Sequence, residues 1–467
     1  MDLSTLRRRG AALLAGLARS ELRSALGDSE ADFTRVFNGF GDLASRDALA
    51  CAREGAAAGE PASRGAAAKL VELVAWAHEG RKTSRALDER DSFSLKATVR
   101  VAGELVPIRE LPRRVDDCQE IAQALDYGGY EALVSATSGI DLAALAAQAA
   151  DVLARTEDAW RDLAAYALRR TTGLIALQPR GEAAFHDLAR NARLALLDDH
   201  FRPLRLIPAL EKAFEAIGLR FDGGDRVELD LSERAGKRPE PILARIDVPR
   251  QITVALQPLG GAADYLTAFD LAGRAQHQAL CSEQAPMEDR WLGDESVPRG
   301  FGLAFAHFLL DPGFLRRVLD IDARDGIEAA RLIAIAQLGE FRKACAQLIF
   351  ERTLYAEGPR SELKGLYREG LQKAMLVDWP VERWLWDVEP RFACARALRA
   401  FALEAALRRA MREACDEDHW RNPRLGSFLE GYASRGQRLD AAALAKDLGG
   451  ELALKGAAAR LIEVGAR

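Results

Sequence analysis

The chain has 467 residues, a formal net charge of -5 and 49% hydrophobic residues. This length allows two or three compact units or one large one, and the hydrophobic content is sufficient for a sizeable core. Acidic and basic residues are interspersed, which argues against the basic stripe of a nucleic-acid-binding protein. Alanine, leucine and arginine dominate while aromatic residues make up only 7%, a composition that favours helix.

Several features favour a cytoplasmic protein without a membrane partner. The six cysteines contain no C-x-x-C pair and are scattered, as expected in a reducing compartment. No apolar run is long enough to span a bilayer. The first residues superficially resemble a signal peptide, but their apolar run is short, and the leucines from Leu3 to Leu22 fit one face of an amphipathic helix.

Residues 1–195 form the first predicted region, which is helical. Residues 92–111 alternate apolar and polar side chains, a pattern that predicts a short hairpin. Residues 140–170 are rich in alanine and leucine and predict either one long helix or two.

Residues 196–467 form the second predicted region. Between about 217 and 258 lie three short runs, VELDL, PILARIDV and QITVAL, separated by polar connections that contain proline and glycine. They predict a small sheet. Gly260 and Gly261 then mark a strand-to-helix turn, followed by a helix over about 262–280 and by further helices to the C-terminus. The fold class is therefore mainly α with a small sheet.

The stretch TAFDLAGRAQH, residues 267–277, lies on that helix. The order of strand, Gly-Gly turn and helix is common in metallopeptidases whose helix carries H-E-x-x-H. There, two imidazoles one turn apart bind zinc, and the glutamate between them is the general base for the attacking water. A third ligand, often a glutamate, comes from a later helix.

Residues 227–315 resemble the thimet oligopeptidase / oligoendopeptidase F family of zinc peptidases. The matching pieces are LDLSERAGKRP, IDVPRQITVALQPLGGAADYLTAFDLAGRAQHQAL and EDRWLGDESVPRGFGLAFAHFLLDPGFL, and the segment that begins RFACARALRAFALEAALRRA resembles the family's C-terminal helices. The first half matches only as a helical pattern. The resemblance implies a zincin-like metallopeptidase fold with a deep cleft, in which residues 196–467 form the catalytic-like region.

The resemblance also implies which residues stand at the zinc site. The first zinc histidine falls on Asp270, the general base on Leu271 and the second histidine on Arg274. The third ligand falls on Arg299. Every element of the family's zinc chemistry is replaced.

Three further positions follow from the same comparison. The C-terminal tyrosines that the family offers to the substrate fall on Ala393 and Ala397. His277 matches a family position beyond the two ligand histidines, which implies a packing or hydrogen-bonding residue.

The replacements predict a vestigial site without zinc and without catalytic residues. Asp270 and Arg274 are four residues apart on one helix, the spacing at which opposite charges pair, and Arg299 is expected to approach from the next helix. Arginine has no lone pair for a metal and repels cations, and Leu271 cannot take a proton from water. The alternative is an ordinary surface pair on an exposed helix.

A non-standard metal site is the other alternative, and it would make the chain an active metalloendopeptidase. It would combine Asp270 and His277 with some of Asp264, Glu288 or Asp289. The neighbouring arginines disfavour it.

The sequence thus predicts a catalytically inactive homologue of an oligopeptidase that binds a peptide or a protein partner, such as an active relative. A purely structural subunit of a larger assembly is a further alternative. In such peptidases the strand before the motif helix pairs with an extended substrate, which makes Gln251, Thr253 and Ala255 the peptide-binding candidates. A plain strand covered by the protein is the competing interpretation.

Overall fold

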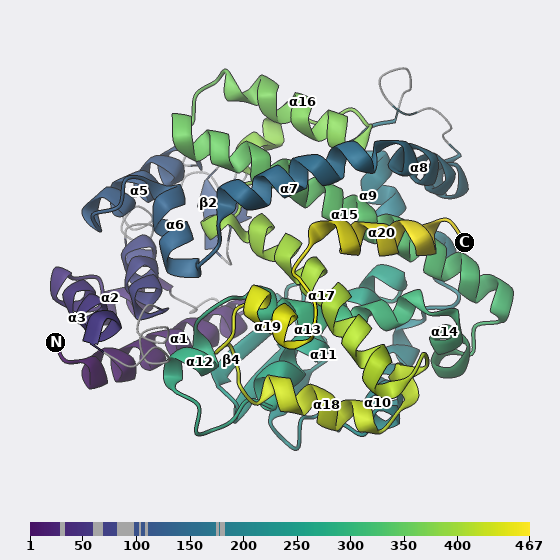
Figure 1. Ribbon diagram of the computed structural model, residues 1–467, viewed down its shortest axis with the longest axis horizontal. Coiled ribbons are helices and arrows are strands. Elements are labelled where there is room, and N and C mark those ends of the chain that lie inside the picture. Colours follow the sequence, from purple (N-terminus) through teal and green to yellow (C-terminus); the bar gives the residue numbers. More distant parts are fainter. Residues whose placement is uncertain are drawn as a thin grey trace.

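The computed structural model describes residues 1–28, 33–58, 69–81, 98–101, 104–107, 111–173, 177 and 183–467. Within them the chain is mainly helical (Figure 1). The predicted hairpin is present as strands β1 (Thr98–Val101) and β2 (Glu104–Pro107), which pair antiparallel. Residues 92–97, 102–103 and 108–110 of the predicted range lie outside the described residues.

The helices before residue 195 pack as amphipathic elements. They are α1 (Leu3–Ala25), α2 (Phe33–Gly39), α3 (Arg46–Ala58), α5 (Leu111–Ala124), α6 (Tyr130–Ser138), α7 (Leu142–Arg155), α8 (Glu157–Thr172) and α9 (Phe185–Arg193), and residues 69–81 are also helical. As predicted, α1 is amphipathic: Leu6, Leu13, Leu14 and Leu17 are buried on one of its faces.

The alanine-rich stretch forms two helices, not one. It divides at Thr156, where α7 ends and α8 begins. The hydroxyl of Thr156 is buried and donates to the carbonyl of Val152, which ends α7 with a side-chain bond to its own backbone. Among the described helices none is by itself long and apolar enough to cross a membrane; α6 and α7 pass that test only as a pair bent by 94°.

The predicted small sheet has three strands, β3 (Val227–Asp230), β4 (Ile242–Asp247) and β5 (Gln251–Ala255). Their order is β3-β5-β4, with β5 parallel to β3 and antiparallel to β4. Four of the five residues of β5 are buried, as expected for a strand that is covered on both faces. The last strand before the motif helix is therefore the central one.

The second region continues in helices to the C-terminus. They are η3 (Ala195–Leu197), η4 (Pro203–Arg205), α10 (Leu206–Ala216), α11 (Ala262–Ala279), α12 (Met287–Trp291), α13 (Ser296–Ala306), η5 (His307–Leu310), α14 (Pro312–Leu319), α15 (Ala323–Glu357), α16 (Leu363–Met375), η6 (Val381–Leu385), η7 (Pro390–Phe392), α17 (Ala393–Cys415), η8 (His419–Arg421), α18 (Arg424–Ala433), α19 (Ala441–Asp447) and α20 (Leu454–Gly465). Gly260 and Gly261, at φ of 82° and 91°, make the turn that leads into α11.

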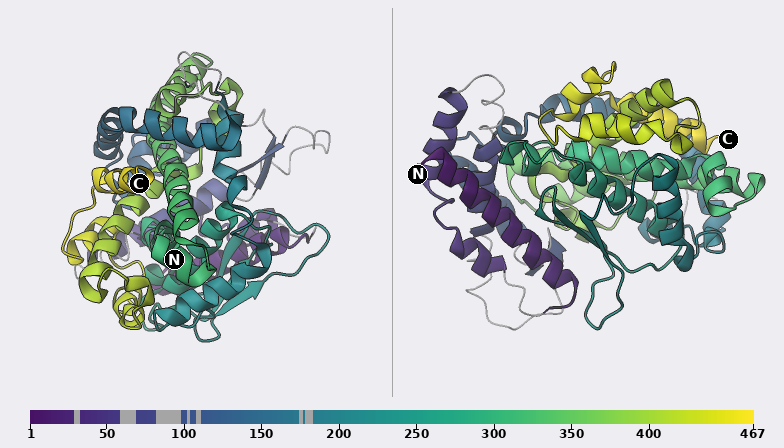
Figure 2. Two further views of the ribbon diagram at one scale, coloured as in Figure 1. Left: turned by 90° about the vertical axis from the view of Figure 1, so that its right-hand side faces the viewer. Right: turned by 90° about the horizontal axis from the view of Figure 1, so that it is seen from below.

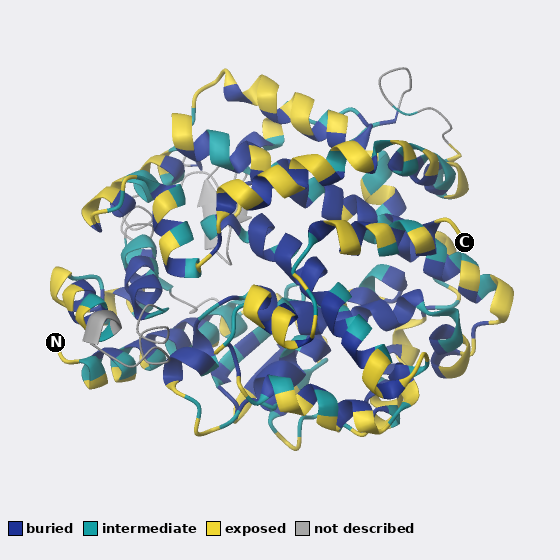
Figure 3. Ribbon diagram, in the orientation of Figure 1, coloured by how far each residue is buried: buried dark blue, intermediate teal, exposed yellow. Residues whose placement is uncertain are grey.

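The core lies where α11, α13, α15 and α17 meet (Figure 3). Of the 11 residues of α13 nine are buried, and of the 18 of α11 thirteen are. Outer helices such as α7 and α16 show exposed residues along one side. In the view from below, α1 lies along the edge of the molecule beside the sheet (Figure 2), and it contacts β4. The division of the chain at residue 195 stays a prediction.

Candidate functional site

Two glycines let α11 and α13 cross at close range. A Cβ at Gly273 would lie 2.9 Å from the Cα of Gly302 and 2.9 Å from the carbonyl oxygen of Phe301. Only a residue without a side chain fits such an approach. The crossing places the middle of α11 against the first turns of α13, and these segments carry Asp270 and Arg299 respectively.

Asp270 and Arg274 form the ion pair that their spacing predicts. Arg274 Nη2 lies 2.5 Å from Asp270 Oδ2, and the two side chains are 28% and 15% exposed. The other carboxylate oxygen, Oδ1, is buried and has no hydrogen-bond partner among the described residues. Burial raises the pKa of Asp270 although Arg274 and Arg299 act to lower it. The pair belongs to a central helix and not to an exposed one.

Arg299 lies in the field of this pair without bonding to it. In the described part of the chain its guanidinium makes no hydrogen bond or ion pair. Burial and the nearby Arg274 lower the pKa of Arg299, while Glu389, Glu295 and Asp270 act to raise it. Glu295 itself is bonded to Arg245 Nη1 at 2.9 Å. The carboxylates of Glu389, Glu295 and Asp270 therefore act on Arg299 only from a distance, and they do not outweigh burial and Arg274.

The other positions that the resemblance assigns to catalytic residues carry aliphatic side chains. Leu271 is 7% exposed and belongs to the hydrophobic core, so no general base stands at that position. Ala393 and Ala397 are half-buried on the first turns of α17. Their methyl groups cannot donate a hydrogen bond to a substrate carbonyl.

His277 is a packing residue. Its ring lies 4.7 Å from that of Phe301, and neither ring nitrogen makes a hydrogen bond of ordinary geometry among the described residues, although the backbone of Gly436 is close enough to act on the imidazole. Burial lowers the pKa of His277 to about 4, so the imidazole is neutral at pH 7.

The side chains at the positions that the sequence resemblance assigns to the zinc ligands do not fit a zinc ion. They supply one carboxylate, already paired, and two guanidinium groups, which cannot act as ligands. Across the described ranges no group of three or more His, Cys, Asp or Glu side chains is placed to hold a metal.

The residues of the alternative metal site are engaged elsewhere. Asp264 accepts from the backbone of Leu259 and Gly260 at the start of α11. Glu288 is bonded to Arg7 at 2.6 Å and Asp289 to Lys69 at 2.5 Å. These carboxylates therefore do not assemble with Asp270 and His277.

The prediction that a peptide adds to the edge of β5 is wrong. Both edges of β5 are paired, one with β3 and the other with β4. Thr253 and Ala255 are 2% and 3% exposed, and Gln251 alone is exposed. An extended peptide cannot pair with this strand unless β3 or β4 leaves, because each edge of a strand accepts one neighbour.

A cavity beside β4 was not predicted from the sequence. It has a volume of about 200 Å³ and lies between α1, residues 69–81 and β4. Leu243 and Arg245, alternate residues of β4, line it together with Leu17, Trp76 and Trp291. Arg245 connects this cavity with Glu295 and hence with the surroundings of Arg299. The only signal in the sequence was the alternation of PILARIDV.

Comparison with known proteins adds evidence on the fold. No family profile and no curated protein matches the sequence. Among solved structures, a protein assigned as an oligoendopeptidase F from Bacillus anthracis covers 95% of this chain and 87% of its own length, with a TM-score of 0.59 and 12% identity. A carboxypeptidase of Pyrococcus furiosus covers 98% and 97%, with a TM-score of 0.64 and 12% identity.

A third solved structure, PZ peptidase A with an inhibitor, covers 96% of this chain and 90% of its own, with a TM-score of 0.64 and 12% identity. Each likeness extends over both halves of the chain, including the half whose sequence matched only as a helical pattern. The chain therefore has the mainly α, zincin-like fold of these metallopeptidases.

Proposed function

We propose that this chain is a non-catalytic relative of the oligopeptidases that acts by binding a peptide or a protein partner. One observation supports the proposal: Asp270 is paired with Arg274 and lies near Arg299, and the sequence resemblance assigns these three positions to the family's metal ligands. The fold is that of a peptidase, but the side chains at these three positions are not a set of zinc ligands.

The physical consequence is the loss of water activation. A zinc ion in such a site polarises the attacking water and the substrate carbonyl. Here fixed guanidinium charges take the place of the metal's positive field, but they cannot coordinate water. Leu271 cannot accept the proton that the water must lose. Hydrolysis by the family's route is therefore not expected.

The cavity beside β4 is the proposed peptide-binding position. β4 has one edge that is not paired within the three-stranded sheet, and side chains spaced two residues apart on a strand point to the same side. Leu243 and Arg245 have that spacing and both line the cavity. Apolar side chains such as Trp76 supply the contact area, and Arg245 supplies a charge. An extended peptide with both apolar and charged side chains suits this lining.

We also propose that the protein works in the cytoplasm. All six cysteines are unpaired and five of them are buried, which suits a reducing compartment.

Peptide retention tests the proposal. Purified protein is incubated with peptides of mixed sequence, with and without zinc, and passed over a size-exclusion column; bound and free peptides are identified by mass spectrometry. Retained, uncleaved peptides are expected for the wild type and for Arg360→Gln, a control at an exposed arginine. Trp76→Ala and Arg245→Gln should retain fewer. A protein partner would instead co-elute as a defined complex when expressed together with the chain.

Cleavage would contradict the proposal. If peptides are hydrolysed, if a chelator stops the reaction, and if Asp270→Asn abolishes it, the chain is an active metallopeptidase with a non-standard site. If no peptide is retained, the peptide-binding part of the proposal fails.

A further inference from the structure

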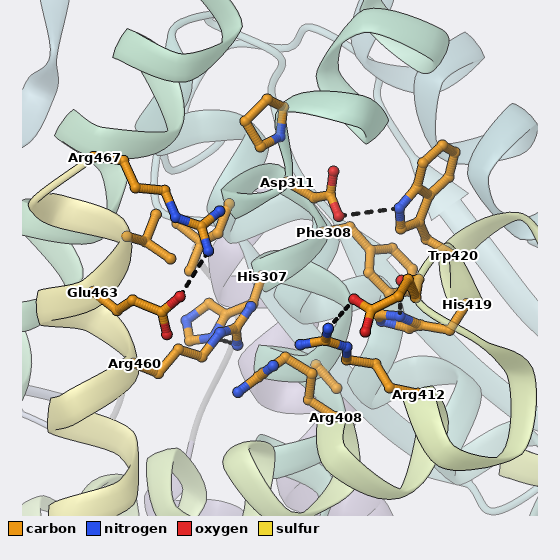
Figure 4. Close-up of a pocket in the computed structure, with 15 residues that line it drawn as sticks. His307, Phe308, Asp311, Arg408, Arg412, His419, Trp420, Arg460, Glu463 and Arg467 are labelled. Carbon is orange, nitrogen blue, oxygen red and sulfur yellow. Dashed lines mark hydrogen bonds and ion pairs between the residues drawn. The ribbon is translucent and has the colours of Figure 1, made fainter.

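A second cavity lies at the C-terminal end of α13 (Figure 4). Its volume is about 160 Å³, and its walls come from η5, the start of α14, α17, η8 and α20. Asp270, Arg274 and Arg299 do not line it. We call it the η5 pocket and define it by His307, Asp311, Arg408, Arg412, His419 and Arg460.

One buried carboxylate at the base of the η5 pocket serves several partners. The side chains of Glu404 and His307 are each 2% exposed, and His307 Nδ1 lies 3.1 Å from Glu404 Oε1. The same oxygen accepts from Arg460 Nη1. Burial acts to raise the pKa of Glu404, but Arg460 and His307 outweigh it and hold the pKa well below its usual range. Oε1 of Glu404 is thus shared by these two neighbours.

Arg408 is left without a hydrogen bond. Its nearest carboxylate oxygen, on Glu404, is 3.9 Å from Nε, and Nε is buried without a partner. In Figure 4 its guanidinium lies beside Arg460 and Arg412. Burial and the charge of Arg460 lower the pKa of Arg408 to about 10. The base of the pocket therefore holds two guanidinium groups for one carboxylate.

The other acids of the pocket form their bonds with groups other than Arg408, although Glu463 acts on its charge from a distance. Glu417 is bonded to Arg412, and Glu463 to Arg467 at 2.8 Å, in pairs at the exposed rim. Asp311 accepts from the backbone at the start of α14 and, at 3.2 Å, from Trp420 Nε1.

His419 supplies an acceptor beside these cations. The residue is 6% exposed, and its Nδ1 lies 3.1 Å from the carbonyl oxygen of Glu417, so Nδ1 carries the hydrogen and donates. Burial lowers the pKa of His419 to about 4, which leaves Nε2 unprotonated at pH 7. Among the described residues no side chain or backbone group bonds Nε2, and Nε2 is not one of the fully buried polar atoms, so it is open to a donor that enters the pocket.

We propose that the η5 pocket binds a small oxyanion that also carries a hydroxyl group. The anion's charge is neutralised by Arg408, and its hydroxyl donates to Nε2 of His419. Inorganic phosphate at neutral pH meets both needs because it keeps a P–O–H group, as does lactate with its carboxylate and hydroxyl. Sulfate and acetate carry the charge but no hydroxyl. The site is separate from the proposed peptide-binding cavity and does not depend on it.

Titration calorimetry on the full chain tests the proposal with matched ligand pairs. Phosphate is compared with sulfate, and lactate with acetate, at equal ionic strength and pH 7. At least one hydroxyl-bearing member is expected to bind more tightly than its partner, and the pair that responds identifies the source of the oxyanion. The same ligand should raise the midpoint of thermal unfolding more than its partner does, a readout that needs no variant.

Two substitutions separate the two contacts. Arg408→Gln should weaken binding of the preferred ligand by about tenfold or more, since a hydrogen bond to a charged group is lost. His419→Phe keeps the ring packed against Phe308 and should remove the preference for the hydroxyl-bearing ligand. Arg360→Gln should change neither value.

Equal binding of both members of each pair, or no binding of any of the four, would overturn the proposal. Unchanged phosphate and lactate affinity in Arg408→Gln would overturn it as well.

Discussion

The two ends of α13 carry two arginine-rich clusters whose charges are balanced differently. Near its start, Arg274, Arg299 and Arg245 face the carboxylates of Asp270, Glu295 and Glu389. Beyond its end, Arg408 and Arg460 share the single carboxylate of Glu404. The first cluster has one carboxylate for each arginine, although Asp270 Oδ1 and Arg299 are not bonded among the described residues, whereas in the second two arginines share one carboxylate.

The difference lies in how many carboxylates accompany the arginines of each cluster. At the start of α13 the positive charge belongs to side chains that the fold holds in place, so the neighbouring carboxylates remain compensated. At its end the compensation is partial, and the burial of Arg408 makes an external anion favourable.

The largest expected effect comes from removing the shared carboxylate. Glu404→Gln should lower the free energy of unfolding by about 3–5 kcal/mol, because buried Arg460 and His307 lose their partner. The matched change Asp270→Asn should alter it by less than about 1 kcal/mol, because that pair is partly exposed and burial already disfavours its ionised form. Urea unfolding at pH 7 measures the free energy of unfolding of both variants. Equal losses in the two would contradict the difference between the clusters.

The crossing that builds the first cluster is the next most sensitive point. Gly273→Ala should destabilise by about 1–3 kcal/mol because the new methyl group meets the backbone of α13. Gly365→Ala on α16 has open space around the added Cβ and should stabilise by about 0.5–1 kcal/mol. The midpoint of thermal unfolding should fall in Gly273→Ala and rise in Gly365→Ala. An unchanged midpoint in Gly273→Ala would argue against the close helix contact.

His277 predicts a smaller effect that depends on pH. Its folded pKa of about 4 lies below the ordinary value of 6.5, so its contribution to stability is complete above 6.5 and is lost as the pH falls toward 4. Between pH 7 and pH 5 the free energy of unfolding of His277→Leu should therefore fall by about 2 kcal/mol less than that of the wild type. Substitution of the exposed His186 is the control, and parallel pH curves for His277→Leu and wild type would refute the prediction.

Local patterns in the sequence were enough to predict much of the cluster around Asp270 and Arg274. The periodic Ala- and Leu-rich stretches and the Gly-Gly turn placed α11, and the spacing of Asp270 and Arg274 predicted their ion pair. The order of the strands was not predictable in this way, because strand alternation does not show which neighbour each edge receives. That is why β5 was mistaken for a strand with a free edge.

The η5 pocket had no local signal at all. His307, Glu404 and Arg460 lie in three separate helical segments and meet only through the packing of α13, α17 and α20. The sequence also could not predict that Arg299 makes no bond among the described residues. A charge pattern predicts which residues come near one another but not which atoms bond.

Zinc binding tests the central claim most directly. Protein stripped with a chelator is titrated with zinc by calorimetry, and bound metal is counted by mass spectrometry, for the wild type, Asp270→Asn and the double variant Asp270→His/Arg274→His. The account predicts no saturable site that depends on Asp270, and no peptide hydrolysis in the double variant, in which Leu271 and Arg299 remain. One zinc per chain in the wild type that disappears in Asp270→Asn would contradict it.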